Sequence, residues 1–285
     1  VNPDETLSAR EKLGMIKERF AGWASEDTER REKLCRIYND LFNATRPRRF
    51  DGSHLKLPGF SRCFVLHPHQ LDSVWRIAQS GNAGRFHVVG AGKTAVCVIA
   101  SMELRRLGFA SKPCHVVPNH MLAQYTAEFV RLYPNASVLM ASKEDLEGDR
   151  RRELVSRIAT GDWDAVVITH SSFERIRMSP RFSERFIKEI IHEIEMAVRA
   201  EKSNDRSNRI VKQLEAMKKN WAVRLEKLSA DQKKDELLSW ELLGIDALFV
   251  DEAHLHKNLY RFTKMTRVAG LPQSNSERAF DLYLK

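Results

Sequence analysis

The chain has 285 residues, of which 42% are hydrophobic and 30% charged, as in a folded domain that buries a core. Its net charge of +9 and pI of about 9.4 favour a polyanionic partner, nucleic acid before an anionic membrane, although a lysine-rich surface gives the same charge. No apolar run is long enough to cross a bilayer, the polar N-terminus does not resemble a signal peptide, and the four cysteines form no CxxC pair. We therefore expect a cytoplasmic protein without membrane contact or a zinc site.

Residues 1–50 are predicted to form two helices. Apolar residues recur at helical spacing in both, namely Leu13, Ile16, Phe20 and Trp23, then Leu34, Ile37, Leu41 and Phe42. A stretch rich in Pro, Gly and Arg follows and is typical of a linker. We place an N-terminal helical extension and linker at 1–63 and the main domain at 64–285.

Short β-rich runs alternate with helical stretches from residue 64 onward. The runs are Phe86–Val89, Cys114–Val117, Ser137–Met140, Ala165–Thr169 and Ala247–Val250, and helices are predicted at Thr94–Leu107 and Met121–Leu132. Apolar strands that alternate with helices predict an α/β domain whose mostly parallel sheet is covered on both faces. We expect five or six strands, with Val89 and Val250 on neighbouring ones.

Residues 181–243 interrupt this alternation with a long, charged, helical insertion. Two apolar stripes predict helices at about 183–202 and 208–230, joined by a polar turn at 203–208. We interpret them as an antiparallel helical hairpin. The pattern leaves open whether the hairpin protrudes as an arm or packs as an amphipathic pair on the sheet domain.

The segment HVVGAGKTAV, residues 87–96, is typical of a phosphate-binding loop. Gly90, Ala91 and Gly92 would bring backbone N–H groups close to phosphate oxygens, at the positive end of the following helix. Lys93 would reach the β- and γ-phosphates, and the Thr94 hydroxyl would coordinate Mg²⁺. The full motif has a glycine five residues before Gly92, where this chain has His87, so the match covers the second half of the motif.

The segment ALFVDEAH, residues 247–254, places two carboxylates directly after an apolar strand. Ligands bind at the carboxyl ends of the strands in open parallel sheets, so these acids are expected beside the phosphate loop. We assign Asp251 to the metal and Glu252 to the base that takes a proton from the attacking water. His254 would couple the site to neighbouring elements, and Lys93 and Asp251 should face one cleft.

With both motifs, the chain resembles superfamily two helicases of the Swi/Snf-like, DEAH-box branch, whose ATP-binding lobes have a RecA-like P-loop fold. More narrowly, it resembles helicase-like proteins of bacteria, phages and mobile elements that are often fused to a DNA methyltransferase. The residues that carry this likeness are GAGKT at 90–94 and DEAH at 251–254. The resemblance implies ATP and Mg²⁺ as cofactors and DNA as the partner.

Three further segments match this family's motif series. LHPHQLDSVWRI at 66–77 looks like the adenine-recognising element, which implies that Gln70 contacts the base. CHVVPNHMLAQY at 114–125 and AVVITHSSFERI at 165–176 look like the two motifs whose strand ends lie near the nucleic-acid backbone. The resemblance implies contacts to double-stranded DNA phosphates from Asn119, His120, Thr169, His170 and Ser171.

Such motors bind ATP between two lobes and take arginine fingers from the second lobe. No [ST]-A-[ST] motif and no second sheet domain follow His254, so we expect a single lobe with little turnover by itself. The leading hypothesis is a DNA-dependent ATPase that moves on or remodels DNA. The alternatives are the motor of a restriction or anti-restriction methyltransferase, a small-molecule kinase using the same loop, and a non-hydrolysing nucleic-acid-binding scaffold.

Overall fold

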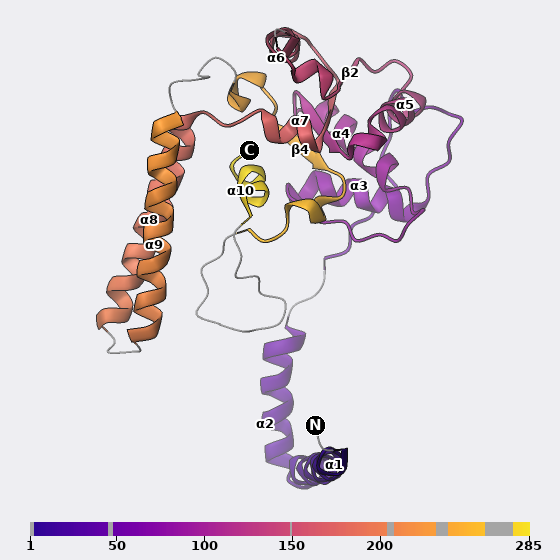
Figure 1. Ribbon diagram of the computed structural model, residues 1–285. Helices are drawn as coiled ribbons and strands as arrows, with labels where there is room; N and C mark the ends of the chain where they lie inside the picture. Colours follow the sequence, from indigo (N-terminus) through magenta and orange to yellow (C-terminus); the bar gives the residue numbers. More distant parts are fainter. Residues whose placement is uncertain (1–2, 45–47, 149, 204–207, 232–238, 260–275) are drawn as a thin grey trace. The chain divides into compact units, whose positions relative to one another are not determined.

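A computed structural model describes residues 3–44, 48–148, 150–203, 208–231, 239–259 and 276–285 (Figure 1). The chain divides into two compact units, Val1–Phe50 and Asp51–Lys285. Residues 51–63, which we grouped with the N-terminal extension, belong to the second unit by their contacts: the Gly52 amide donates to Asp72 Oδ1 (2.9 Å) and the Ser61 amide to the Leu132 carbonyl (2.8 Å). Among the described residues, no helix is long and apolar enough to cross a membrane.

The first unit contains the two predicted helices, α1 (Pro3–Glu26) and α2 (Thr28–Tyr38). Asp27 separates them and caps α2, because its carboxylate accepts the backbone amides of Glu29 and Arg30. The apolar stripe predicted from the sequence stays exposed in this unit, with Phe20 59% and Trp23 47% accessible. None of the α1 and α2 side chains whose burial the structure describes is buried, so these described side chains form no core.

The second unit is built around four parallel strands in the order β2-β3-β1-β4. They are β1 (Pro113–Val117), β2 (Val138–Ala141), β3 (Ala165–Thr169) and β4 (Ala247–Val250). Each lies within one residue of its predicted bounds, because each is a short run of buried apolar residues. The α/β fold with a parallel sheet is confirmed and is of the RecA-like type.

Helices cover both faces of this sheet. Alternating residues of a strand face opposite sides, so Cys114 and Val116 pack into one core cluster while Val117 packs into the other. Buried residues of α3 (Pro68–Ser80), α4 (Lys93–Arg106) and α5 (Leu122–Leu132) form the cluster on one face. Residues of α6 (Arg150–Thr160), α7 (His170–Arg175) and the 3-10 turn Trp240–Leu243 form the cluster on the other.

The predicted strand Phe86–Val89 is absent, and this expectation was wrong. Residues 83–88 have no regular secondary structure, and Phe86 and Val89 are 98% and 95% exposed. Their β-favouring side chains cannot form a strand without a ladder partner. In the described residues β4 pairs only with β1, so Val89 and Val250 are not on neighbouring strands and the sheet has four strands rather than five or six.

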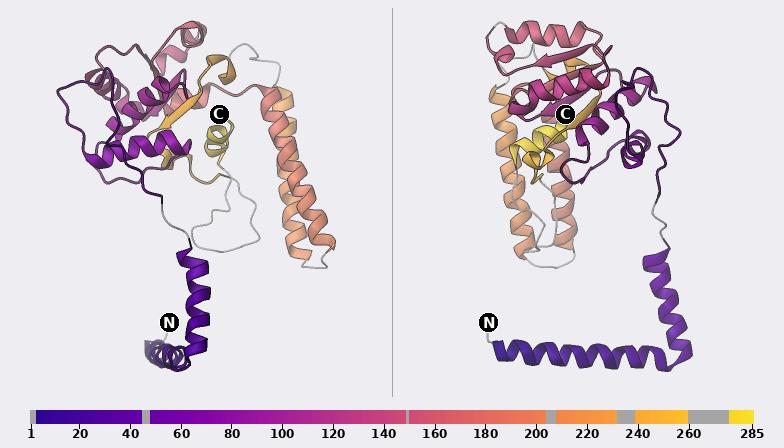
Figure 2. Two further views of the ribbon diagram at one scale, coloured as in Figure 1. Left: turned by 180° about the vertical axis from the view of Figure 1, so that it is seen from behind. Right: turned by 90° about the vertical axis from the view of Figure 1, so that its right-hand side faces the viewer.

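The helical insertion forms the predicted hairpin of α8 (Pro180–Ser203) and α9 (Asn208–Asp231), seen side by side in Figures 1 and 2. Ile187, Ile194, Leu214 and Trp221 are buried between its helices. This cluster is separate from the two sheet clusters, and it includes Phe280 of α10 (Glu277–Leu284). The hairpin therefore packs on itself and on α10 rather than on the faces of the sheet.

Candidate nucleotide-binding site

The glycine-rich turn leads directly into α4, with Lys93 as the first helical residue. Gly90 and Gly92 have φ values of 83° and 74°, in the left-handed region that glycine enters without a steric penalty. A Cβ at Gly92 would also collide with the side-chain amide of Gln70, whereas Gly90 has open space around it. The sequence motif thus forms a turn at a helix N-terminus, where backbone N–H groups and the helix dipole favour an anion.

The side chain of Gln70, on α3, forms a hydrogen bond with the backbone of this turn. Its Oε1 accepts the backbone amide of His67 (2.9 Å), and its Nε2 donates to the carbonyl of Ala91 (3.2 Å). His69 Nε2 also lies 3.4 Å from the Ala91 carbonyl. Gln70 is 8% exposed, so both ends of its amide are committed to protein groups. The structure thus places Gln70 beside the loop, and its contact with a base stays a prediction.

The Lys93 ammonium group faces the loop that precedes it. Its Nζ donates to the carbonyls of His87 (3.4 Å) and Val88 (3.3 Å), and none of the described carboxylates forms an ion pair with it. Arg85, which the sequence analysis missed, donates from Nη1 to the Lys93 carbonyl (2.7 Å) and from Nη2 to Cys97 Sγ (2.6 Å). Lys93 is thus a cation with only weak partners, which an incoming phosphate can replace.

The acidic motif follows the end of β4. The Asp251 amide donates to the Val116 carbonyl (2.9 Å), which extends the β1–β4 ladder by one residue. Glu252 then has φ 52° and ψ 45°, a left-handed conformation that is rare for a residue with a long side chain. Glu252 and His254 are both exposed, and His254 Nδ1 lies 2.9 Å from Glu252 Oε2. Residues in such strained conformations cluster at functional sites.

Asp251 and the start of α4 lie close together. Cys97, one turn after Lys93, is buried, and its burial raises the pKa of the thiol. Arg85 opposes this rise and the negative charge of Asp251 adds to it. Phe249 of β4, two residues before Asp251, packs in the same core cluster as Cys97. The structure therefore brings the phosphate-loop helix and the acidic strand end into one neighbourhood.

The predicted nucleic-acid residues occupy the ends of β1 and β3. Ser171 Oγ donates to Asn119 Oδ1 (3.0 Å), so two of them meet across neighbouring strands. The Thr169 hydroxyl caps α7 by accepting the Ser172 amide (3.1 Å). His120 and Asn119 are exposed.

His170 differs from this group because it is buried, at 6% exposure. Its Nε2–H donates to the Asp251 carbonyl (2.9 Å), and its Nδ1 lies 3.1 Å from His256 Nε2. Burial lowers the pKa of His170. Both ring nitrogens thus face protein groups, and direct DNA contact by His170 stays a prediction. Sequence reasoning missed His256, which lies two residues after the His254 on which it concentrated.

The residues around the turn fit a magnesium nucleotide. Among the described residues, no group of three His, Cys, Asp or Glu side chains is placed to hold a metal by itself. Mg²⁺ at nucleotide sites usually takes only one or two protein oxygens and completes its shell with water and phosphate. Thr94 and Asp251 can supply those two oxygens, and Lys93 and the glycine turn can hold phosphate.

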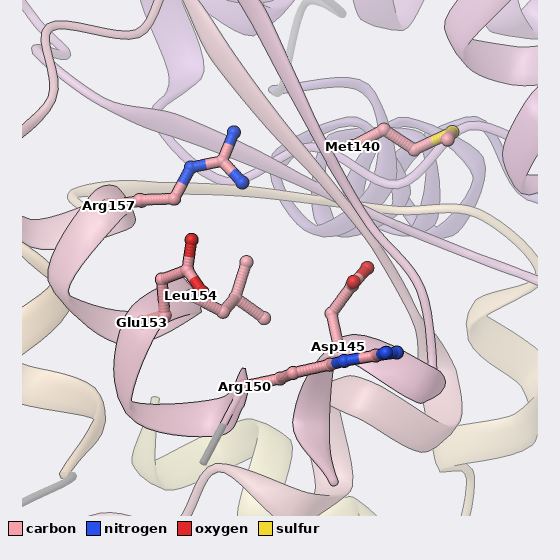
Figure 3. A pocket seen from close by; sticks show the side chains of 6 residues that line it. All are labelled: Met140, Asp145, Arg150, Glu153, Leu154 and Arg157. Atoms are coloured by element: carbon pink, nitrogen blue, oxygen red, sulfur yellow. The ribbon is translucent and has the colours of Figure 1, made fainter.

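A polar pocket lies elsewhere, where α6 meets β2, at the opposite edge of the sheet from β4 (Figure 3). It is lined by Met140, Asp145, Arg150, Glu153, Leu154 and Arg157. None of the predicted site residues lines it. The two arginines are exposed and flank Glu153 on the same helix, so this pocket is distinct from the nucleotide-binding candidate.

The structure thus combines a RecA-like α/β fold with a glycine turn at the start of α4 and an acidic pair after β4. Residues 75–285 match the family model described as "Probable helicase domain", and residues 1–44 match a "Domain of unknown function (DUF8437)". The first match covers more than half of the chain, which therefore belongs to this helicase-domain family.

The chain is also similar to "Defense against restriction protein B" of Escherichia phage P1. The two sequences are 21% identical over an alignment of 321 residues, which covers 97% of this chain and 14% of the phage protein. The chain thus spans about one seventh of the length of this relative.

Proposed function

We propose that the chain is the ATP-binding lobe of a helicase-type, DNA-dependent ATPase of the Swi/Snf-like, DEAH-box branch. In this proposal, ATP hydrolysis drives movement along double-stranded DNA or its remodelling. The main support is that the elements carrying the two sequence motifs pack together: Phe249 of β4, two residues before Asp251, lies in the same core cluster as Cys97 of α4, one turn beyond Lys93. Asn119 and Ser171 meet at the ends of the adjacent strands β1 and β3, at the same edge of the sheet, and we propose that they contact DNA there.

Each residue of the site has a distinct role in this proposal. Lys93 leaves the carbonyls of His87 and Val88 to bind the β- and γ-phosphates. Thr94 and Asp251 would hold Mg²⁺, which would neutralise phosphate charge when bound. Glu252 accepts a proton from the attacking water, with His254 Nδ1 2.9 Å from its carboxylate to orient it.

DNA and a second lobe are the proposed partners. Asn119, His120, Thr169 and Ser171 are polar groups at two adjacent strand ends and suit phosphate contacts that do not read sequence. A second RecA-like lobe would supply arginine fingers, which typically contribute about a thousandfold or more in rate. The described Arg85 is already engaged by the Lys93 carbonyl and Cys97, so it is poorly placed to act as a finger.

The anti-restriction motor is the second candidate, because the similar phage protein is named for defense against restriction. In that case the lobe works within a longer protein that carries or recruits a DNA methyltransferase. Methyl transfer from S-adenosylmethionine to DNA, measured on the complete protein that contains this chain, separates the two candidates. Methylation that requires an intact Lys93 supports the anti-restriction motor, and its absence supports a motor without a methyltransferase.

The proposal is tested by nucleotide binding and ATP turnover of the complete protein with and without double-stranded DNA. Lys93→Ala should weaken ATP binding, because it removes a positive charge from the phosphates. Glu252→Gln should bind ATP normally but lose turnover by roughly a hundredfold or more, because the amide cannot accept the proton. Lys143→Ala removes an exposed positive charge after β2 and serves as the control. Equal loss of binding in both site variants contradicts the assigned roles, and binding without DNA-stimulated turnover favours a scaffold.

A further inference from the structure

Two buried histidines join the acidic motif to α10. His170 Nε2–H donates to the Asp251 carbonyl (2.9 Å), and His256 Nδ1–H donates to the Arg278 carbonyl (3.2 Å). A carbonyl oxygen only accepts, so each of these outer ring nitrogens carries a hydrogen. The inner nitrogens of the two rings lie 3.1 Å apart, and both side chains are less than 8% exposed. Two neutral rings have no hydrogen left to share between these inner nitrogens, so the rings are joined by contact and not by a hydrogen bond. A chain of buried contacts, with a hydrogen bond at each end, thus connects the peptide of Asp251 to α10.

The other side of α10 contacts the base of the helical hairpin. Phe280 is buried against Trp221 of α9, with ring centroids 5.2 Å apart, and against Phe186 of α8, at 6.0 Å. The Arg224 guanidinium lies 3.9 Å from the centre of the Phe280 ring and also pairs with Glu277. Tilted aromatic contacts and cation–π contacts of this kind fix the relative position of the elements that form them. The start of α8 and the end of α9 are therefore tied to α10.

Helix α10 is also fastened to α7, which carries His170. Arg278 Nε pairs with Glu174 Oε1 (2.9 Å), and the buried Lys285 ammonium donates to the Phe173 carbonyl (2.6 Å). A displacement of α10 would thus shift α7 as well as His256. Both routes lead to His170 and from there to the Asp251 carbonyl.

We propose that His170 and His256 are positioning residues that orient Asp251 and transmit to it the position of the hairpin base. This inference rests on the proposed function, in which Asp251 holds Mg²⁺. The next residue, Glu252, has a positive φ, so surrounding contacts must impose the backbone direction at this point. A hydrogen bond to the Asp251 carbonyl is such a contact. Binding of a partner to the hairpin would then alter metal binding at the nucleotide site through α10.

The first test separates the two contacts of His256. In His256→Gln the amide can still reach His170 but not Arg278, and in His256→Asn it can still reach Arg278 but not His170. Each variant should raise the Mg²⁺ concentration that half-saturates binding of a fluorescent ATP analogue by about tenfold or more, as loss of outer-shell partners of metal ligands does. Affinity for the analogue without Mg²⁺ should not change. Unchanged Mg²⁺ half-saturation in both variants overturns the proposal.

The same measurement on His170 shows whether the bond or the bulk of the ring matters. His170→Ala removes the donor to the Asp251 carbonyl, whereas His170→Gln retains an N–H near the position of Nε2. His170→Gln should therefore recover much of the Mg²⁺ affinity that His170→Ala loses. Equal losses in the two variants mean that His170 only fills space.

The hairpin end of the path is tested by Trp221→Ala, which removes the main ring that packs on Phe280. This change should raise the Mg²⁺ half-saturation, and it should add less than its full effect when combined with His256→Gln, because the path through His256 is then cut and only the contacts of α10 with α7 remain. Lys218→Ala is the control: it breaks the 2.7 Å ion pair with Glu195 between α8 and α9 without touching α10. Fully additive effects of Trp221→Ala and His256→Gln contradict transmission through His256.

Hydrogen exchange without nucleotide separates this inference from the proposed function. Trp221→Ala should speed exchange of the amides at 253–256 in an otherwise unchanged chain, and should speed it less in a His256→Gln chain, in which only the contacts of α10 with α7 remain. If the wild-type chain binds no nucleotide, the proposed function is contradicted. The hydrogen-exchange measurement still decides in that case whether the hairpin and the acidic motif are linked. No change at 253–256 on Trp221→Ala overturns the link.

Discussion

His115 shows how a single buried side chain sets a property of the whole domain. It lies on β1 with no exposed surface, stacks on Phe249 at 4.9 Å and has Nδ1 2.8 Å from the Tyr125 hydroxyl. Burial, with a further contribution from Arg85, lowers the pKa of His115 to about 3. The ring is therefore neutral in the folded chain, although it would accept a proton near pH 6.5 when exposed.

The stability of the domain should consequently fall in mild acid. The folded pKa of His115 is depressed, so its contribution is complete above about pH 6.5 and is lost as the pH falls toward 3. At pH 5 this loss is roughly 2 kcal/mol for a folded pKa of about 3. Urea unfolding at pH 7 and pH 5 should show it, and His115→Phe should reduce the difference. Replacing the exposed His120 by Gln should leave it unchanged, and an unaltered difference in His115→Phe would refute the assignment.

The two glycines of the turn differ in their surroundings, and this difference is testable. Both have positive φ, so alanine at either position costs about 1 kcal/mol or more in backbone conformation. At Gly92 the new Cβ would in addition collide with the Gln70 amide, whereas at Gly90 it meets open space. Gly92→Ala should therefore weaken nucleotide binding clearly more than Gly90→Ala, measured by titration calorimetry. Equal losses would show that Gln70 moves away freely.

Among the elements, the helical hairpin has its own small core. Ile187, Ile194 and Leu214 are almost fully buried between α8 and α9, in a cluster that shares Phe280 with α10 but excludes the strands. Ion pairs also form on the surface of the hairpin. Lys188–Glu184 and Lys218–Glu195 are examples, each with an N–O distance of 2.7 Å. Exposed pairs of this kind contribute little, so the apolar seam provides most of the stability.

Ile187→Ala should therefore destabilise the hairpin by roughly 2–4 kcal/mol, the usual cost of an emptied core position. Met196→Ala, on the same helix at 52% exposure, should cost less than about 0.5 kcal/mol. Native-state hydrogen exchange of α8 and α9 distinguishes the two variants. Because the sheet clusters do not include Ile187, exchange in β1 and β3 should stay slow in both. Rapid exchange throughout the chain in Ile187→Ala would mean that hairpin and sheet unfold together.

For the whole molecule, the net charge of +9 and the polar ends of β1 and β3 lead to one expectation. Phosphate contacts release counterions, so affinity for double-stranded DNA should fall steeply with salt and vary little with base sequence. Replacing Asn119 and Ser171 by alanine should weaken binding equally for unrelated sequences, and fluorescence anisotropy over a salt series measures this. Affinity that is indifferent to salt would indicate a different partner.

Much of this molecule could be predicted from its sequence because the signals are local. Apolar runs such as Ala165–Thr169 and Ala247–Val250 predict buried strands whatever their pairing partners are. Apolar residues at helical spacing, such as Ile187 and Ile194, likewise predict helices without information about distant residues. The loop motif likewise predicted a glycine turn at the start of α4, because the need for positive φ is a property of the turn itself.

The tertiary structure alone decided which segments meet. Phe86–Val89 has the composition of a strand but no ladder partner among the described residues, and pairing depends on what lies alongside rather than on composition. The path from Asp251 through His170 and His256 to α10 joins residues up to 108 positions apart in the chain, and nothing in their spacing indicated it. The sequence motif singles out His254, which is exposed in the structure. His256, two residues later, is buried, because burial follows from packing and not from the motif.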